Sequence, residues 1–260
     1  MSYVELITGT SGKLGRALAP LYPNALKPTS TELNIVNQTA DEEYIKTHMA
    51  APDSNLLIHL AAMTSPPRCE ENPSRAWDIN VFGTLRLLKA CKKYAPDTFF
   101  VLMSTACVFA GDDETPKHEN SIPYPDNIYG LTKMIQELAV ATSDLKYLII
   151  RGNFVPKEKW PYPAAFTDRK SNYLFAHQLA KGMKEAIDHY YETESQGDIV
   201  HILGDKILSM YELAHKCPDS ENVLPITYEE YYKQNPKAVK LTKSMVLEST
   251  QWKKYSIEEG

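Results

Sequence analysis

The 260-residue sequence contains few cysteines, few glycines and no excess of basic residues. Its 4 cysteines form no CxxC pair and have no metal-like spacing with the 7 histidines, so we expect no structural zinc. Lysine and arginine number 28 against 33 acidic residues, which leaves a formal charge of -5. Without a basic run to neutralise phosphates, the chain is not expected to bind nucleic acid.

Long hydrophobic runs are also missing. The longest apolar stretch, FFVLMSTACVFAG, is shorter and more mixed than the roughly 20 apolar residues that cross a bilayer. The first residues lack the basic segment, apolar core and small-residue cleavage site of a signal peptide. These absences predict a reduced, cytoplasmic protein that makes no contact with a membrane.

Three of the 11 glycines nevertheless lie within seven residues, in YVELITGTSGKLGRAL. Gly9, Gly12 and Gly15 form the pattern GxxGxxG between an apolar run and a helix-like segment. In that setting glycines permit a tight turn, the approach of a pyrophosphate and close packing of helix on sheet. Three glycines can also mark an ordinary loop, but the strand-turn-helix setting favours a dinucleotide site.

Apolar runs alternate with helix-like segments through the first 150 residues. The expected strands are 3–9, 24–29, 55–62, 98–109 and 146–152, and the expected helices are 12–22, 39–50, 73–94 and 129–143. This order, with nearly continuous apolar strands, is typical of an α/β fold in which helices cover both faces of a doubly wound parallel sheet.

The alternation ends after Arg151. Residues 153–172 carry prolines and aromatics without a period, and are followed by expected helices at 173–191 and 209–217. We divide the chain into a Rossmann-type NAD(P)-binding domain, 1–155, and a small irregular cap, 156–260, in which 198–205 is a candidate strand of the sheet. Ligands of such sheets bind at the carboxyl ends of the strands, so we expect the cap to supply the substrate pocket.

Two basic residues suggest which dinucleotide is bound. Lys27 stands where an NAD-preferring protein usually has an acidic residue, and Arg16 directly follows the third glycine. Both side chains could face a 2′-phosphate. The sequence therefore favours NADPH, with NADH as the alternative.

Tyr129 and Lys133, in YGLTK, lie four residues apart at the start of a helix and so share one face. A nearby ammonium group lowers the pKa of a phenol, which suits a proton donor near neutral pH. Two solvated surface residues would show the same spacing. Thr105, at the end of the preceding strand, would present a hydroxyl to the same crevice and favours the catalytic interpretation.

Together the segments TGTSGKLGR, HLAAMTSPPRCEENPSRAWDINVFGT, MSTACVFAGD and PYPDNIYGLTK resemble the extended short-chain dehydrogenase/reductases, most closely the dTDP-4-dehydrorhamnose reductase branch. The resemblance implies NAD(P)H-dependent reduction of the C4 keto group of a nucleotide-linked 4-keto-6-deoxysugar, as in rhamnose biosynthesis. Thr105 would bind the substrate carbonyl, Tyr129 would protonate it, and Lys133 would hold the nicotinamide ribose.

The resemblance also implies a cofactor-binding set. Asn80 matches the family's helix asparagine, although a buried polar residue that ties helix to strand would look the same. The implied set is Gly9, Thr10, Ser11, Gly12, Lys13, Leu14, Gly15, Arg16, Lys27, Ala61, Ala62, Asn80, Tyr129 and Lys133.

Cys107 opens a second interpretation, because TACVF is similar to bifunctional 3,5-epimerase/4-reductases that use a cysteine there as an acid/base. A cysteine at the end of a buried strand is more often an inert small hydrophobe. The candidates for a partner acid/base are His177, Lys170 and Lys181, and those for stacking on the sugar or base, or for the core of the cap, are Trp160 and Tyr162.

A third interpretation is a non-catalytic, dinucleotide-binding regulatory subunit, since the β subunit of methionine adenosyltransferase resembles the same branch. The complete set of Thr105, Tyr129 and Lys133 argues against it, because a protein that only binds has no use for a tuned phenol. A homodimer through the two long helices is a further expectation from the family.

Overall fold

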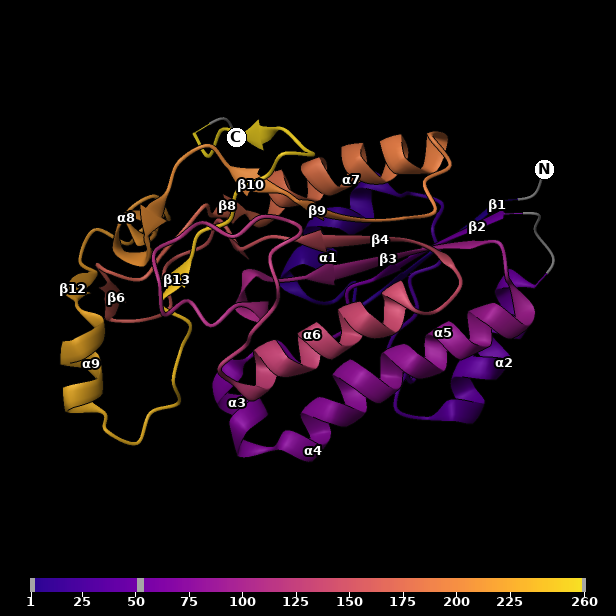
Figure 1. Ribbon diagram of the computed structural model, residues 1–260, viewed down its shortest axis with the longest axis horizontal. Coiled ribbons are helices and arrows are strands. Elements are labelled where there is room, and N and C mark those ends of the chain that lie inside the picture. The colour runs from indigo at the N-terminus through magenta and orange to yellow at the C-terminus, as the bar shows by residue number, and fades with distance from the viewer. Residues whose placement is uncertain (1–2, 51–53, 259–260) are drawn as a thin grey trace.

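The computed structural model describes residues 3–50 and 54–258. Its central sheet has the order β1-β2-β3-β4-β9, and all neighbouring strands are parallel (Figure 1). The strands are β1 (Tyr3–Thr8), β2 (Ser54–His59), β3 (Thr98–Ser104), β4 (Lys146–Arg151) and β9 (Gly197–His201). The predicted α/β fold with a parallel sheet is confirmed.

Helices cover both faces of this sheet (Figure 1). One face carries α1 (Lys13–Leu18) and α7 (Ala176–Glu192), and the other carries α2 (Gln38–Met49), α5 (Gly83–Tyr94) and α6 (Ile128–Ala141). Successive residues of β3 alternate between the two layers: Phe99 and Val101 pack toward α7, whereas Phe100 and Leu102 pack toward α5. Burial on both faces explains why the strands are almost entirely apolar.

The expected helix at 73–94 is built from three consecutive pieces. They are α4 (Pro73–Ala76), the π-helical turn η2 (Trp77–Phe82) and α5. A further helix, α3 (Pro66–Glu71), was not expected from the sequence. Its signals are present, because Ser65 caps it by accepting the Arg68 amide and proline occupies its first turn.

The expected strand at 24–29 is wrong. Only Leu26 pairs with β1, through two backbone hydrogen bonds of 2.8 and 2.9 Å. Pro28 has no amide proton with which to continue the ladder. Leu26 lies beside β1 on the edge opposite β2. The chain therefore runs from β1 to one side and then returns to β2 on the other side. This reversal places the topological switch point of the sheet at the carboxyl end of β1.

The remaining elements are short. They are η1 (Ala19–Leu21), η3 (Ala106–Val108), β5 (Phe154–Val155), β6 (Ala164–Phe166), β7 (Lys170–Ser171), β8 (Leu174–Phe175), β10 (Leu203–Gly204), β11 (Leu208–Ser209), α8 (Met210–Ala214), β12 (Leu224–Ile226), α9 (Tyr228–Gln234), β13 (Ser244–Met245) and β14 (Lys254–Tyr255). Most belong to the cap, whose apolar cluster packs against η3 and the start of α6. The segment 198–205 contributes β9 to the central sheet, while β10 pairs with β14 outside it.

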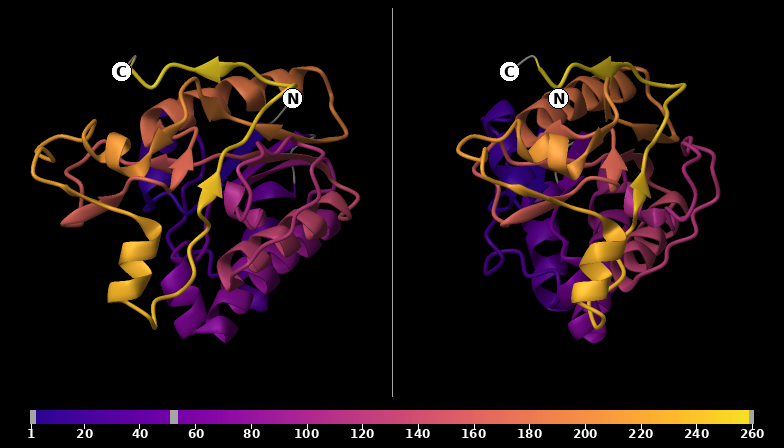
Figure 2. Two further views of the ribbon diagram at one scale, coloured as in Figure 1. Left: turned by 60° about the vertical axis from the view of Figure 1, so that its left-hand side comes forward. Right: turned by 90° about the vertical axis from the view of Figure 1, so that its left-hand side faces the viewer.

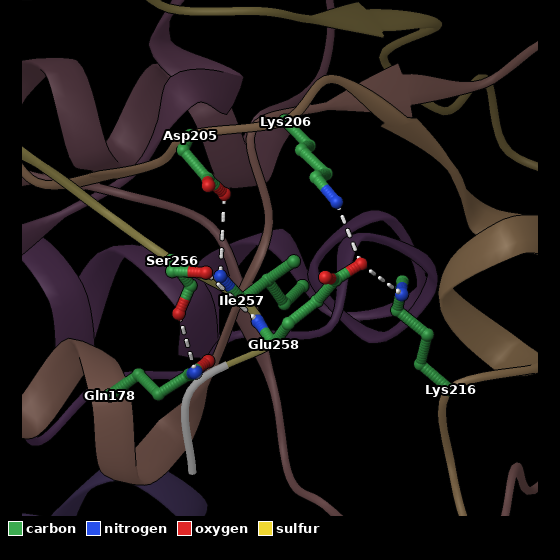
Figure 3. A network of polar contacts seen from close by, with 7 residues as sticks. All are labelled: Gln178, Asp205, Lys206, Lys216, Ser256, Ile257 and Glu258. Carbon is green, nitrogen blue, oxygen red and sulfur yellow. Dashed lines mark hydrogen bonds and ion pairs between the residues drawn. The ribbon is translucent and has the colours of Figure 1, made fainter.

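The C-terminal segment lies across the cap beside α7 (Figure 2). Glu258 lies between Lys206 and Lys216, with its Oε1 2.7 and 3.3 Å from their Nζ atoms (Figure 3). The Ile257 amide donates to Asp205 Oδ1 at 3.3 Å. The Ile257 side chain is 3% exposed and belongs to the apolar cluster of the cap, so it is the buried anchor of this segment.

Ile257→Ala should lower the free energy of unfolding by about 2–4 kcal/mol, because it removes a buried aliphatic side chain and leaves a cavity. Urea denaturation followed by circular dichroism measures this loss. Glu258→Gln is the matched control, and its midpoint should stay close to that of the parent, since exposed ion pairs contribute little. Equal losses of unfolding free energy in the two variants would contradict the role of Ile257 as the buried anchor.

Candidate functional site

A cleft of ≈ 880 Å³ runs along the carboxyl edge of the sheet. Its lining comes from the segments after β1, β2, β3 and β4, from residues 28–36, and from the first turns of α6. Among the described residues, none after Pro156 lines it. Of the cap, 156–260, only Pro156 among the described residues lines this cleft, whereas the sequence led us to expect a larger contribution.

The three glycines after β1 have different roles. Gly9 has φ +74°, and a Cβ there would lie 2.6 Å from the Ala61 amide nitrogen. A Cβ on Gly15 would lie 2.3 Å from the Gly9 carbonyl oxygen. At Gly12 the nearest atom would be 3.2 Å away, and this residue lines the cleft. Gly9 and Gly15 thus serve the protein's own packing, whereas Gly12 keeps the turn open to a ligand such as a pyrophosphate.

Most of the predicted cofactor residues line this cleft. They are Gly9, Thr10, Ser11, Gly12, Lys13, Leu14, Gly15, Ala61, Ala62, Tyr129 and Lys133. Three of the predicted cofactor residues do not line the cleft: Arg16, Lys27 and Asn80.

Arg16 and Lys27 lie outside the cleft lining, although Ser11, to which Arg16 is bonded, belongs to it. The Arg16 guanidinium donates to the Ser11 carbonyl at 3.4 Å and lies 4.0 Å from Glu158. The Lys27 ammonium donates to the Tyr22 carbonyl at 2.6 Å. The exposed cations on the cleft lining are instead Lys13 and Arg75.

Asn80 is fully buried and ties η2 to the loop after β2. Its amide oxygen accepts from the Met63 amide at 2.7 Å, and its NH₂ group donates to the Met63 carbonyl and to Thr132 Oγ1. This is the structural role that the sequence left open for it.

Several residues of the lining were not predicted from the sequence. Apart from Thr8, Leu60, Met103 and Ser104 at the strand ends, they are residues 28–30 and 33–36, Thr64, Arg75, Ile79 and residues 152–156. The last group follows β4 directly, so the rule that ligands bind at the carboxyl ends of strands would have found it. The others come from loops and helix faces, for which the linear pattern carries no comparable signal.

Thr105, Tyr129 and Lys133 all line the cleft. Thr105 directly follows β3, and its hydroxyl accepts from the Cys107 amide at 3.2 Å. Asn127 caps α6 by accepting the Gly130 amide at 2.9 Å, which places Tyr129 in the first helical turn. One turn later, Lys133 donates to the Met103 carbonyl at 2.7 Å.

Burial dominates the electrostatics of this group. It raises the pKa of Tyr129, and the neighbouring Cys107 adds to the rise while the Thr105 hydroxyl opposes it. Burial also lowers the pKa of Lys133 to about 8, against the attraction of the Glu137 carboxylate. The net shift of the phenol is opposite to the expected one, because desolvation outweighs any stabilisation of the phenolate by the ammonium.

Cys107 does not line the cleft. Its side chain is 6% exposed, and its Sγ lies 3.7 Å from Met245 Sδ within the apolar cluster of the cap. The three candidate partner groups, His177, Lys170 and Lys181, are exposed and lie outside the cleft lining.

The two aromatics proposed for stacking are also absent from the cleft lining. Trp160 is buried in the cap, where its indole donates to the Ala164 carbonyl at 3.4 Å. Tyr162 is 63% exposed. Of the two readings left open for Trp160, burial favours the core of the cap.

Residues 4–162 match the family model described as the RmlD substrate binding domain. The chain belongs to this family. The predicted resemblance to the dTDP-4-dehydrorhamnose reductase branch is thereby confirmed.

Among curated relatives, the chain is 34% identical over 155 residues to the dTDP-4-dehydrorhamnose reductase of Mycolicibacterium smegmatis. It is 30% identical over 163 residues to that of Streptomyces griseus, and 30% over 157 residues to the methionine adenosyltransferase 2 subunit beta of Rattus norvegicus. These matches cover 58%, 61% and 56% of this chain. The chain spans about half the length of these relatives, namely 45%, 50% and 45%.

Solved structures show the same fold over nearly the whole chain. The dTDP-4-dehydrorhamnose reductase of Bacillus anthracis, in complex with NADP, has a TM-score of 0.83 at 22% identity and covers 99% of this chain and 96% of its own. The enzyme of Yersinia enterocolitica has a TM-score of 0.79 at 24% identity, with coverages of 96% and 91%.

Two further observations apply to the described ranges, 3–50 and 54–258. None of the helices in them combines the length and apolarity needed to cross a membrane. Within the same ranges, no three histidine, cysteine, aspartate or glutamate side chains are grouped so as to hold a metal ion.

Gly15→Ala should lower the midpoint of thermal unfolding clearly more than Gly12→Ala does. The added methyl group at residue 15 meets backbone at 2.3 Å, and overpacking of this kind costs about 1–3 kcal/mol. Differential scanning calorimetry of both variants measures the difference. Similar midpoints would show that α1 can move away from β1 without cost.

Proposed function

We propose that this protein reduces the C4 keto group of a nucleotide-linked 4-keto-6-deoxysugar with NAD(P)H. One observation carries the proposal: Thr105, Tyr129 and Lys133 line the same cleft as the glycine turn after β1. A hydroxyl, a phenol and an ammonium group thus lie in one cavity with a turn that suits a pyrophosphate.

The residues that would hold the dinucleotide follow from their places along the cleft. The turn from Gly9 to Gly15 would receive the pyrophosphate, Ala61 and Ala62 would lie beneath the adenosine, and Lys133 would bind the ribose hydroxyls of the nicotinamide half. When bound, the reduced nicotinamide supplies a hydride.

Tyr129 would supply the proton at the substrate oxygen. The raised pKa of its phenol keeps it protonated at neutral pH, as a donor must be. The Thr105 hydroxyl would orient the carbonyl, and both donors would stabilise negative charge on its oxygen in a site with little water. Positioning and electrostatics are therefore the main contributions of the protein.

NADPH remains the proposed cofactor, with NADH as the alternative. The NADP bound to the related Bacillus anthracis enzyme supports the first choice. Arg16 and Lys27 do not support it, because both lie outside the cleft lining. Lys13 and Arg75 would be the cations available to a 2′-phosphate.

A dinucleotide-binding regulatory subunit is the second candidate. It is favoured by the packing of Tyr129 within the apolar cluster of the cap and by the absence of described cap residues after Pro156 from the cleft lining. The similarity to methionine adenosyltransferase 2 subunit beta agrees with it. The burial of Cys107 gives no support to an additional epimerase activity. A cytoplasmic location and a homodimer through two long helices stay predictions.

Tyr129→Phe should reduce turnover by about 100-fold or more, since it removes the proton donor. The assay follows loss of reduced nicotinamide with dTDP- and UDP-4-keto-6-deoxyglucose, each with and without an added 3,5-epimerase. Fluorescence titration should give a cofactor Kd within a few-fold of the parent.

The matched control is Tyr162→Phe, an exposed tyrosine that should leave turnover unchanged. Full activity in Tyr129→Phe would refute the proposed mechanism. Tight cofactor binding by the parent without turnover of any keto sugar would favour the regulatory subunit.

A further inference from the structure

A buried ion pair joins the end of β4 to α6, the helix that carries Tyr129 and Lys133. Arg151, the last residue of β4, donates to both carboxylate oxygens of Glu137 on α6, from Nε at 2.9 Å and from Nη2 at 2.7 Å. The two side chains are 1% and 6% exposed. Such a bidentate pair fixes the orientation of the carboxylate as well as its charge.

The same carboxylate holds the end of β3. Ser104 donates from Oγ to Glu137 Oε1 at 2.5 Å, and the preceding carbonyl, that of Met103, accepts from Lys133 Nζ at 2.7 Å. Lys133 and Glu137 lie four residues apart and so project from the same face of α6. Two consecutive residues of β3 are thus bonded to one helix face immediately before Thr105.

The segment that follows β4 is also hydrogen-bonded to Thr105. Two residues after Arg151, Asn153 lines the cleft and accepts from the Thr105 hydroxyl at 3.5 Å. Glu137 therefore connects the three elements that present the polar groups of the site, which are the ends of β3 and β4 and the first turns of α6.

The Glu137 carboxylate is paired with Arg151, and at longer range it also favours the charged form of Lys133. Burial disfavours the ammonium form, and Glu137 is the neighbouring group whose charge favours it. The other titratable groups around this part of the structure are Tyr129 on α6, Cys107 after β3, Cys69 and Glu70 on α3, His59 on β2, Arg151 on β4 and His201 on β9, whose Nε2 lies 3.4 Å from Arg151 Nη1. Burial holds the pKa of His59 at about 3, so this imidazole stays neutral, and Arg151 carries the same sign as Lys133.

We propose that Glu137 is a positioning residue which, anchored by Arg151, holds the end of β3 against α6 and keeps Lys133 in the ammonium form that binds ribose hydroxyls. The second part rests on the proposed function. The charge of Lys133 can be tested without substrate or cofactor.

Glu137→Gln tests the role of the charge, because the amide keeps the size and one oxygen acceptor. NMR titration of protein labelled at the lysine side chains gives the midpoint of Lys133, assigned by its absence in Lys133→Arg. The midpoint should fall below that of the parent by about one pH unit or more, which corresponds to tenfold in the ionisation constant. An unchanged midpoint would overturn the proposal.

Cofactor affinity gives a second readout. Below both midpoints Lys133 is charged in either protein, so the Kd values should be similar near pH 6. Between the two midpoints Lys133 stays charged to a larger extent in the parent than in the variant. Near pH 8 the variant should therefore bind the cofactor several-fold more weakly than the parent. A loss of equal size at every pH would indicate a merely structural role. If the parent itself does not bind a nicotinamide dinucleotide, the proposed function fails, while the titration still tests the charge of Lys133.

Removal of the carboxylate leaves Arg151 buried without its partner, and this can prevent folding. The double variant Glu137→Gln/Arg151→Met removes the unpaired charge and should show the same lowered midpoint. Asp144→Asn is the matched control, because it breaks the exposed pair with Lys92 and should leave the titration of Lys133 unchanged.

Discussion

Parallel pairing of β1, β2, β3 and β4 is the constraint on which the site depends. Parallel strands need crossover connections, and their helices cover both faces of the sheet, so the one surface left for a ligand is the edge where strands end. The glycine turn, Ala61, Thr105 and Asn153 all begin within two residues of the ends of these strands. The location of the cleft therefore follows from the topology of the sheet, and the side chains determine only what the cleft can bind.

Burial of polar groups is the second theme of the structure. Lys133 and Tyr129 are removed from water, and their pKa values move in opposite directions because desolvation disfavours whichever form is charged. The surrounding polar groups are extensively paired: Asn80 bonds both groups of the Met63 backbone, and Arg151 is bonded to Glu137. Because these polar groups have hydrogen-bond partners, they can be buried among the apolar residues that surround the sheet.

Much of the fold could be predicted from the sequence, because the strands are apolar on both faces and the helices keep a regular period. The predicted strand at 24–29 failed where Pro28 interrupts the ladder, since apolar character does not reveal a missing donor. The cap was expected to line the ligand site. Its aromatic residues, such as Trp160, pack instead on one another and on the start of α6, because nothing in their spacing distinguishes a core from a stacking surface.

The sequence by itself determined the strand-turn-helix around Gly9 and the shared helix face of Tyr129 and Lys133, because turns and helical periodicity are local properties. Tertiary structure alone decided that Glu137 on α6 bonds to the ends of β3 and β4. It also decided the direction in which the phenol's pKa moves. These outcomes depend on which groups from distant parts of the chain share a buried volume, and burial depends on the packing of the whole chain.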